Sequence, residues 1–157
     1  MAWLERILSW MKIERHDIGR QGVGTYLTRW VLFGPRDQAT GTRRYGHGPK
    51  VFLHLFHRSD VEPYFHDHPW PYWSLILWGG YHEETPQGRR WYGPLSLLRR
   101  PAEWQHRVDV PEGQRCWTLL WIGTKVRSWG FWCPKTGFLP WRQHEANQSA
   151  GKPGCGE

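Results

Sequence analysis

Residues 64–80, YFHDHPWPYWSLILWGG, place two histidines one residue apart directly before an aromatic, apolar run that ends in two glycines. In an extended strand, residues two apart point to the same face, so His66 and His68 project together, about 7 Å apart at their α-carbons. Two imidazoles on one face can chelate a metal ion, which in proteins normally has three or four protein ligands. Asp67 points to the opposite face, which indicates a structural role.

A further ligand has to come from another strand. His106 is the best candidate, because alternation along EWQHRVDV (103–110) puts it on the same face as Trp104 and Val108. That face is apolar, as the inward face of a barrel should be. The alternative is that these histidines are solvated or hydrogen-bonded within the core, as a lone HxH in a strand usually is.

Short segments rich in β-branched and aromatic residues, separated by Gly, Pro and Asp, run along most of the chain. They predict an all-β sandwich or barrel. The predicted strands cover residues 25–33, 50–58, 63–68, 73–84, 89–93, 95–100, 103–110, 115–123 and 129–133.

Residues 2–12 precede the strands and carry apolar side chains at helical spacing, which predicts a short N-terminal amphipathic helix. We expect this helix to pack on the domain or against a second subunit, so a homodimer is an open option, and lying on a membrane surface is a minority interpretation. Residues 17–24, DIGRQGVG, predict a loop, because their glycines match no dinucleotide fingerprint.

A length of 157 residues suits one domain, and 13 tryptophans, six tyrosines and six phenylalanines must build its core or its pocket. We expect a single domain over residues 1–157, with a flexible, polar tail from 144 to 157. The three cysteines are odd in number and lack CxxC spacing, so we expect reduced thiols. The sequence has neither an apolar run of about 20 residues nor a cleavable signal, which favours a cytoplasmic protein with no membrane partner.

The formal charge of +7 comes mostly from arginine, including the doublets at 43–44, 89–90 and 99–100. Arginine suits bidentate recognition of phosphate or carboxylate, so a small-molecule substrate that bears either group is one interpretation. The other is that these pairs keep the surface soluble. Nucleic acid is a weaker alternative as a partner.

The middle third of the chain resembles the two motifs of the cupin superfamily. The first motif is an HxH, three or four residues, a Glu, six residues and a Gly, and the second centres on a Pro, a Gly and a later His. HDH at 66–68 supplies the HxH, and Gly79 stands at the motif glycine if Tyr72 takes the Glu position. Pro101 and His106 match the second motif. The run at 66–81 also resembles small phage and bacterial cupin proteins of unassigned function.

The resemblance implies a cupin-like double-stranded β-helix, or jelly-roll barrel. Because Tyr72 stands in place of the Glu, and Glu103 in place of the second motif's glycine, it implies a metal site of three histidines, His66, His68 and His106. Three-histidine cupins include thiol dioxygenases similar to cysteine dioxygenase, in which ferrous iron keeps open positions for substrate and O₂. One Fe(II) ion is therefore implied, while three neutral imidazoles also suit Zn²⁺, Ni²⁺, Mn²⁺ or Cu²⁺.

Tyr64 and Tyr72 are candidate catalytic residues, because both are expected beside the metal. A phenol there could donate a hydrogen bond to bound oxygen or substrate, or act as an acid or base. The alternative for both is packing in an aromatic wall, and the tryptophans likewise could line a dry pocket or fill the barrel.

Other polar residues near the predicted site are weaker candidates. Glu62 is an option as a fourth ligand, although Glu62 and Glu83 lie near strand ends, where glutamates are normally solvated. His54 and His57 point to opposite faces of a neighbouring predicted strand, so at most one of them faces the interior.

Three functions are compatible with these observations. The first is a metal-binding cupin that acts as a mononuclear Fe(II)-dependent oxygenase or dioxygenase on a small, anionic substrate. The second is a metal-free cupin of the sugar isomerase or epimerase type, and the third is a non-catalytic module that binds a ligand or nucleic acid. The fold alone does not choose among them, because one fold carries many chemistries.

Overall fold

The structure is a computed structural model that describes residues 2–20, 24–42 and 48–156. Within these ranges no helix is long and apolar enough to cross a membrane. The helices and strands, in chain order, are α1 Ala2–Trp10, β1 Glu14–Arg20, β2 Gly24–Phe33, β3 Lys50–Phe56, β4 Phe65–His66, β5 Tyr72–Trp78, β6 Tyr81–Thr85, β7 Gly88–Tyr92, β8 Leu97–Arg100, β9 Arg107–Asp109, β10 Cys116–Ile122, β11 Gly130–Cys133, β12 Gly137–Pro140 and α2 Trp141–Ser149.

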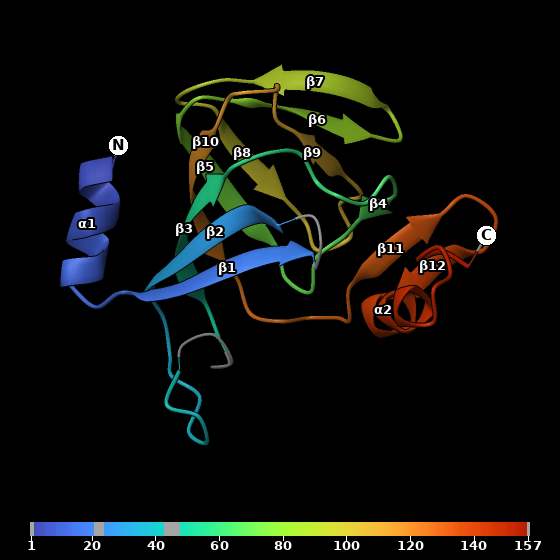
Figure 1. The fold of residues 1–157 in the computed structure, drawn as a ribbon, viewed down its shortest axis with the longest axis horizontal. Helices are drawn as coiled ribbons and strands as arrows, with labels where there is room; N and C mark the ends of the chain where they lie inside the picture. Colours follow the sequence, from blue (N-terminus) through green and yellow to red (C-terminus); the bar gives the residue numbers. More distant parts are fainter. Residues whose placement is uncertain (1, 21–23, 43–47, 157) are drawn as a thin grey trace.

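The strands form antiparallel sheets. A six-stranded sheet has the order β1-β2-β3-β10-β5-β8, and two three-stranded sheets have the orders β12-β11-β4 and β7-β6-β9. Figure 1 shows α1 on one side of the molecule and α2, with β11 and β12, on the opposite side. The predicted all-β class with an N-terminal helix is confirmed.

Period-two alternation explains how the six-stranded sheet separates an inner from an outer face. Along β5, Tyr72, Ser74 and Ile76 are buried, whereas Trp73 and Leu77 are exposed. The inner face packs on the other sheets and encloses the candidate site. On the outer face, α1 buries Leu8 in one cluster with residues of β2, β3 and β10, namely Trp30, Leu53, Leu55 and Trp117.

Gly79 makes the turn between β5 and β6. Its φ is +75°, and a Cβ at this position would lie 2.1 Å from the carbonyl oxygen of Arg115. Both the backbone conformation and the close approach therefore require glycine. This gives a steric reason for the glycine that the sequence shares with the first cupin motif.

The structure corrects the predicted loop at 17–24. Strand β1 continues to Arg20 and pairs with β2, with a register shift between Ile18 and Gly19; residues 21–23 lie outside the described residues. β1 is an edge strand, held by backbone pairing on one side, so its polar sequence carries no apolar alternation that would reveal it.

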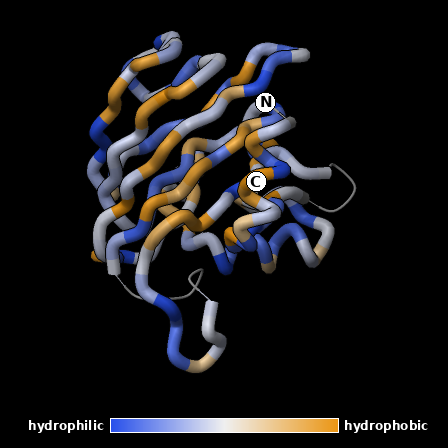
Figure 2. Tube along the Cα trace, turned by 90° about the vertical axis from the view of Figure 1, so that its left-hand side faces the viewer, coloured by the Kyte–Doolittle hydropathy of each residue, from blue (hydrophilic) through white to orange (hydrophobic). Residues whose placement is uncertain are grey.

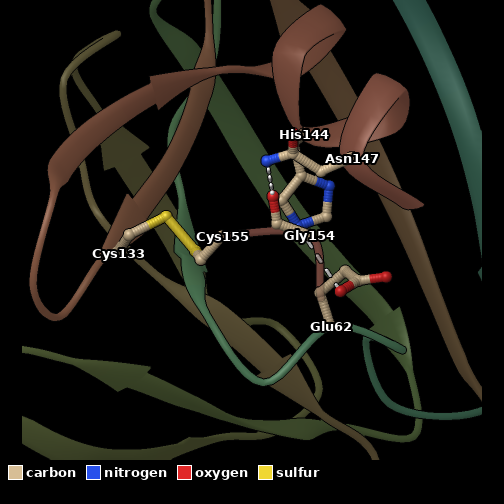
Figure 3. Close-up of a disulfide and its surroundings, with 6 residues drawn as sticks. All are labelled: Glu62, Cys133, His144, Asn147, Gly154 and Cys155. Atoms are coloured by element: carbon tan, nitrogen blue, oxygen red, sulfur yellow. Dashed lines mark hydrogen bonds and ion pairs between the residues drawn. A yellow bond between two sulfur atoms is a disulfide. The ribbon is translucent and has the colours of Figure 1, made fainter. Parts of the chain in front are cut away.

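The structure also corrects the expected flexible tail and the expected reduced thiols. Residues up to Ser149 form α2, and Cys133 is joined to Cys155 by a disulfide, with their α-carbons 5.6 Å apart. Asn147 Nδ2 donates a hydrogen bond to the carbonyl oxygen of Gly154 at 2.8 Å, which ties the end of the chain to α2 (Figure 3). Cys116 is a free, buried thiol, as expected.

Candidate metal centre

Backbone pairing places the histidines together. His66, at the end of β4, exchanges two hydrogen bonds with His106, just before β9: the His66 amide donates to the His106 carbonyl at 2.9 Å, and the reverse bond is 3.0 Å. The amide of His68 donates to the carbonyl of Ala102 at 3.0 Å. The two histidine segments, about 40 residues apart in sequence, are thus held in one register.

Asp67 holds the HDH segment from the other side. It is completely buried and accepts hydrogen bonds from the amide of Gly130 at 2.9 Å and from Trp132 Nε1 at 3.1 Å, and it forms an ion pair with Arg127. Because all these partners lie at or near β11, Asp67 fixes the direction in which its two histidine neighbours project. The side chain is structural, as the strand alternation indicated.

His66, His68 and His106 offer ligand atoms that all lie within 4.8 Å of one another. The Nε2 atoms of His68 and His106 are 2.9 Å apart. Imidazole nitrogens bound to one ion at about 2.0–2.1 Å lie about 3–3.5 Å from each other, within the range seen here. Small rotations of the rings would therefore suit a metal, and the donor set fits a borderline divalent cation such as Fe²⁺ or Zn²⁺.

The electrostatic environment keeps two of these imidazoles neutral. Burial lowers the pKa of His66 to about 4; Asp60 opposes this shift and His106 adds to it. Burial, reinforced by His106 and His66, lowers the pKa of His68 well below its usual value. Neutral imidazole is the form that binds metal, so at neutral pH these nitrogens have lone pairs to offer.

Glu83 orients the third histidine. It is 2% exposed, and its Oε1 lies 2.9 Å from His106 Nδ1. Trp104 Nε1 and Arg100 also donate to this carboxylate. Burial alone would raise the pKa of Glu83, but the hydrogen bonds from His106 and Arg100 outweigh it and hold the pKa at about 2.

An ionised Glu83 accepts a hydrogen bond from His106 Nδ1, which turns the Nε2 atom of the ring towards His68. The Nε2 atoms of the two rings lie 2.9 Å apart. The expectation of a solvated Glu83 is therefore wrong. The alternation along β6, in which Tyr81 and Glu83 are buried on the same face, is the signal that could have placed it inward.

The three histidines lie where two hollows meet. An inner cavity of about 90 Å³ extends between the sheets, and an outer groove of about 420 Å³ runs between β1, the residues at 60–62 and α2. His106 lines the inner cavity only. The residues that line both are Tyr26, Arg29, Asp60, His66, His68 and Trp70.

The structure treats the two candidate catalytic tyrosines differently. Tyr72 lines the inner cavity, with its ring centroid 5.0 Å from that of His68, and burial raises its pKa well above the usual value. Its hydroxyl therefore stays protonated and can donate a hydrogen bond. Tyr64 lies elsewhere, with its ring 6.1 Å from that of His144 in α2. It precedes the two-residue strand β4 in a bend, so the alternation that links it to His66 does not apply.

The weaker candidates also differ in whether they line one of the two hollows. His54 is buried, lines the inner cavity and accepts a hydrogen bond from Arg29 Nε at 2.8 Å, whereas His57 contacts Thr28. Glu62 lines the outer groove and accepts a hydrogen bond from Gln148. It does not belong to the three-histidine group found among the described residues.

The lowered histidine pKa values predict that acid destabilises the metal-free protein. Between about pH 6.5 and pH 4 the unfolded chain protonates His66 while the folded chain does not, so the free energy of unfolding falls as the pH falls. For this residue the slope is at most about 1.4 kcal/mol per pH unit. His68 acts with the same sign. Urea unfolding at several pH values in this window measures the slope.

The variant His66→Gln is the control for this prediction, because it removes one titrating group and should unfold with a shallower dependence on pH. Equal slopes for the variant and the unchanged protein would contradict the prediction.

No protein-family model and no curated protein sequence matches the chain. Solved structures do match its fold. The polyketide cyclase RemF from Streptomyces resistomycificus aligns with a TM-score of 0.58 at 16% identity, over 86% of this chain and 89% of that chain.

Two further matches have other chemistry in their names. A sugar phosphate isomerase of the cupin superfamily from Silicibacter pomeroyi aligns with a TM-score of 0.54 at 15% identity, over 78% of each chain. The Fe(II) form of HppE aligns with a TM-score of 0.54 at 9% identity, over 71% of this chain and 57% of that chain. At these identities the likeness establishes the fold alone.

Proposed function

We propose that this chain, whose fold is that of the cupin superfamily, is a mononuclear metal-dependent enzyme, specifically an Fe(II)-dependent oxygenase of a small, anionic substrate. The resemblance drawn from HDH, Gly79, Pro101 and His106 is confirmed for the fold. The observation that carries the proposal is the group of three histidine nitrogens within 4.8 Å, two on imidazoles kept neutral by burial and the third oriented by Glu83.

In this proposal His66, His68 and His106 hold the ion, and no carboxylate shares its charge. When bound, ferrous iron would supply the redox chemistry with O₂ at positions that the protein leaves open. His106 is buried between the sheets, and His66 and His68 face the groove, through which substrate would reach the ion. Tyr72 donates a hydrogen bond to the reacting group, since its raised pKa keeps the phenol protonated.

Arg29 is the residue that we assign to an anionic group of the substrate. It lines both hollows, and its guanidinium lies 4.6 Å from the ring of Phe52 and bonds to His54, which fixes its position. A fixed guanidinium between groove and metal can hold a carboxylate or phosphate while the adjacent part of the molecule meets the histidines.

Elemental analysis of protein purified without a His tag tests the metal site. We expect about one equivalent of metal in the unchanged protein and its loss in His66→Ala and in His106→Ala. His57→Ala is the matched control, because His57 lies outside both hollows and should leave the metal content unchanged. Unchanged metal content in both site variants would refute the site.

The oxygenase activity needs a separate test. Protein loaded anaerobically with Fe(II) should consume O₂ in the presence of one member of a panel of small carboxylates and phosphates, and His106→Ala should not. Retained metal without O₂ uptake on the panel would leave a metal site and refute the oxygenase.

A metal-free sugar isomerase is the second candidate, and the residues around His68 support it. Tyr72 lies beside His68, and Arg29 could hold a sugar phosphate. Purified protein with no metal that isomerises a sugar phosphate, and loses this activity in Tyr72→Phe, would favour this function over the first.

The cytoplasmic location stays a prediction. Reduced thiols would suit the cytosol, but the structure joins Cys133 to Cys155 in a disulfide. Disulfides are rare in the cytosol and persist in oxidising compartments.

A further inference from the structure

Helix α2 forms one wall of the outer groove, the hollow that leads to His66 and His68. The facing wall includes residues of β1 and the loop at 60–62. The members of α2 that line the groove are Trp141, His144, Glu145 and Gln148. The position of α2 therefore sets the width of the groove and the access to the two histidines.

The hydrophobic core of the fold does not include α2. The three hydrophobic clusters found among the described residues have no member from residues 129–156. Figure 2 shows hydrophobic residues recurring along adjacent strands of the sheet, whereas Figure 1 shows α2 at the side of the molecule with β11 and β12. Helix α2 can therefore move without opening the core.

A small number of contacts hold the helix itself. Its sequence is polar, and His144 is the one buried residue among its nine. The His144 ring stacks on Phe131, with ring centroids 3.8 Å apart, and Trp141 stacks on Trp129 at 6.0 Å. A helix of this length is marginal in water without tertiary support, so α2 depends on the segments that it contacts.

The segment after α2, residues 150–156, turns back along the helix and supports it. The carbonyl oxygen of Gly154 accepts a hydrogen bond from Asn147 Nδ2 at 2.8 Å, and a Cβ at Gly154 would overlap the His144 ring. On the other side of that ring, His144 Nε2 lies 3.5 Å from Glu62 Oε2 in the facing wall of the groove (Figure 3). The contacts thus run from the segment through the helix to the facing wall.

The disulfide between Cys133 and Cys155 closes this arrangement. Cys133 ends β11, which pairs with β4 beside His66 and is therefore fixed to the site. The covalent ring formed by the bond contains β12, α2 and the segment that turns back. While the ring is closed, α2 can leave the groove only as a loop tethered at both ends, so opening gains little entropy. Breaking the bond frees one end and favours the open state.

A dithiol reductant can break this bond by exchange. One thiolate of the reductant attacks a sulfur of the disulfide and forms a mixed disulfide, which releases the other cysteine; the second thiol of the reductant then releases the first cysteine and closes the reductant's own disulfide. The protein gains two electrons and two protons, as the thiols of Cys133 and Cys155, and the reductant loses them. Cys116 is completely buried, and burial raises the pKa of its thiol to about 12, so it does not compete in the exchange.

We propose that the Cys133–Cys155 disulfide is a redox-sensitive latch on the groove. In the oxidised protein it holds α2 as a wall, and its reduction by a dithiol lets residues 141–156 move away and opens the groove to His66 and His68. That the groove admits substrate rests on the proposed function, whereas the movement of α2 does not.

Hydrogen exchange followed by mass spectrometry tests the movement on the full, metal-free chain. The oxidised form is identified by one reactive thiol among its three cysteines, and dithiothreitol under native conditions gives the reduced form. We expect the amides of α2 to exchange on the order of 100-fold faster after reduction, the factor that corresponds to freeing a loop of about this length. Peptides of β5 and β10 should stay protected in both forms.

Cys155→Ala should show fast exchange of α2 with and without reductant. Cys116→Ala is the matched control, because it keeps the disulfide and should respond to reductant as the unchanged protein does. Exchange of α2 that reduction does not accelerate would overturn the proposal, as would a disulfide that dithiothreitol cannot reduce in the folded protein. Exchange of α2 in the reduced protein at the rate of β5 would also overturn it, because the helix would then open only when the whole domain unfolds.

Modification with diethyl pyrocarbonate measures access to the groove on the same metal-free protein. This reagent attacks neutral imidazole, the form in which burial keeps His66 and His68. Reduction should speed the modification of both in proportion to the opening of α2 and leave His57, which lies outside both hollows, unchanged. Fast exchange of α2 without faster modification of His66 and His68 would refute the opening of the groove. Neither measurement needs bound metal, so a protein that binds none would refute the proposed function and not the latch.

Discussion

Replacing Glu83 with alanine is expected to lower metal affinity about 10- to 100-fold and to lower the free energy of unfolding by about 3–5 kcal/mol. Glu83 accepts hydrogen bonds from His106, Arg100 and Trp104. Its removal leaves the guanidinium of Arg100, itself 9% exposed, without its buried counter-charge. It also releases His106 Nδ1, so that the ring can turn and either nitrogen can carry the proton.

Glu84→Ala is the control, because this neighbouring carboxylate is partly exposed and pairs with Arg107 at the surface. A surface pair of this kind contributes roughly 0–1 kcal/mol, and metal affinity should not change. Titration with Zn²⁺ or Fe²⁺ measures the affinity, and urea unfolding of the metal-free variants measures the stability. Metal affinity in Glu83→Ala equal to that of the unchanged protein would contradict the role assigned to Glu83.

Removing the disulfide with Cys155→Ala is expected to lower the free energy of unfolding by about 3 kcal/mol. The bond closes a loop across a sequence separation of 22 residues, and constraining a loop of that length in the unfolded chain is worth about this much. Loss of the disulfide should also affect the outer groove. Gly154 packs so closely on His144 of α2 that a Cβ there would lie 1.9 Å from His144 Nε2, and the bond at Cys155 holds this contact.

Reductant provides the control for the disulfide. It should lower the melting temperature of the unchanged protein to that of Cys155→Ala and leave the variant unaffected. Counting the thiols that react under denaturing conditions without reductant should give one, Cys116, in the unchanged protein. Three reactive thiols in the unchanged protein, together with a melting temperature that reductant does not lower, would contradict the prediction.

The parts of the fold that could be predicted are those in which burial leaves a periodic pattern. β2, β3, β5 and β10 have one face in the core, so their apolar residues show in the sequence. β1 and β12 are held by backbone pairing at sheet edges and carry no such pattern. Helix α2 is mostly polar and buries only His144, so its sequence resembles a loop, and long-range contacts with the disulfide-linked segment hold it in place.

The residues of the candidate site also fall into those that could be predicted from a local pattern and those that could not. The HDH pair and His106 could be predicted from the sequence, because the two-residue period of a strand and the cupin motifs can both be read from short stretches of consecutive residues. The partners of Glu83 and Arg29 could not be assigned, since they depend on which strands pair. Tyr64 was placed wrongly because β4 has only two residues, too few for alternation to extend to its neighbours.

The unequal size of the two hollows sets a limit on what can react. The inner cavity, at about 90 Å³, accepts only a few water-sized molecules, whereas the groove, at about 420 Å³, is in the range of sites for small ligands. The histidines stand at the neck between them. In the proposed enzyme, a ligand in the groove would present only one end to the metal, and this restriction would select terminal groups and make the reaction regioselective.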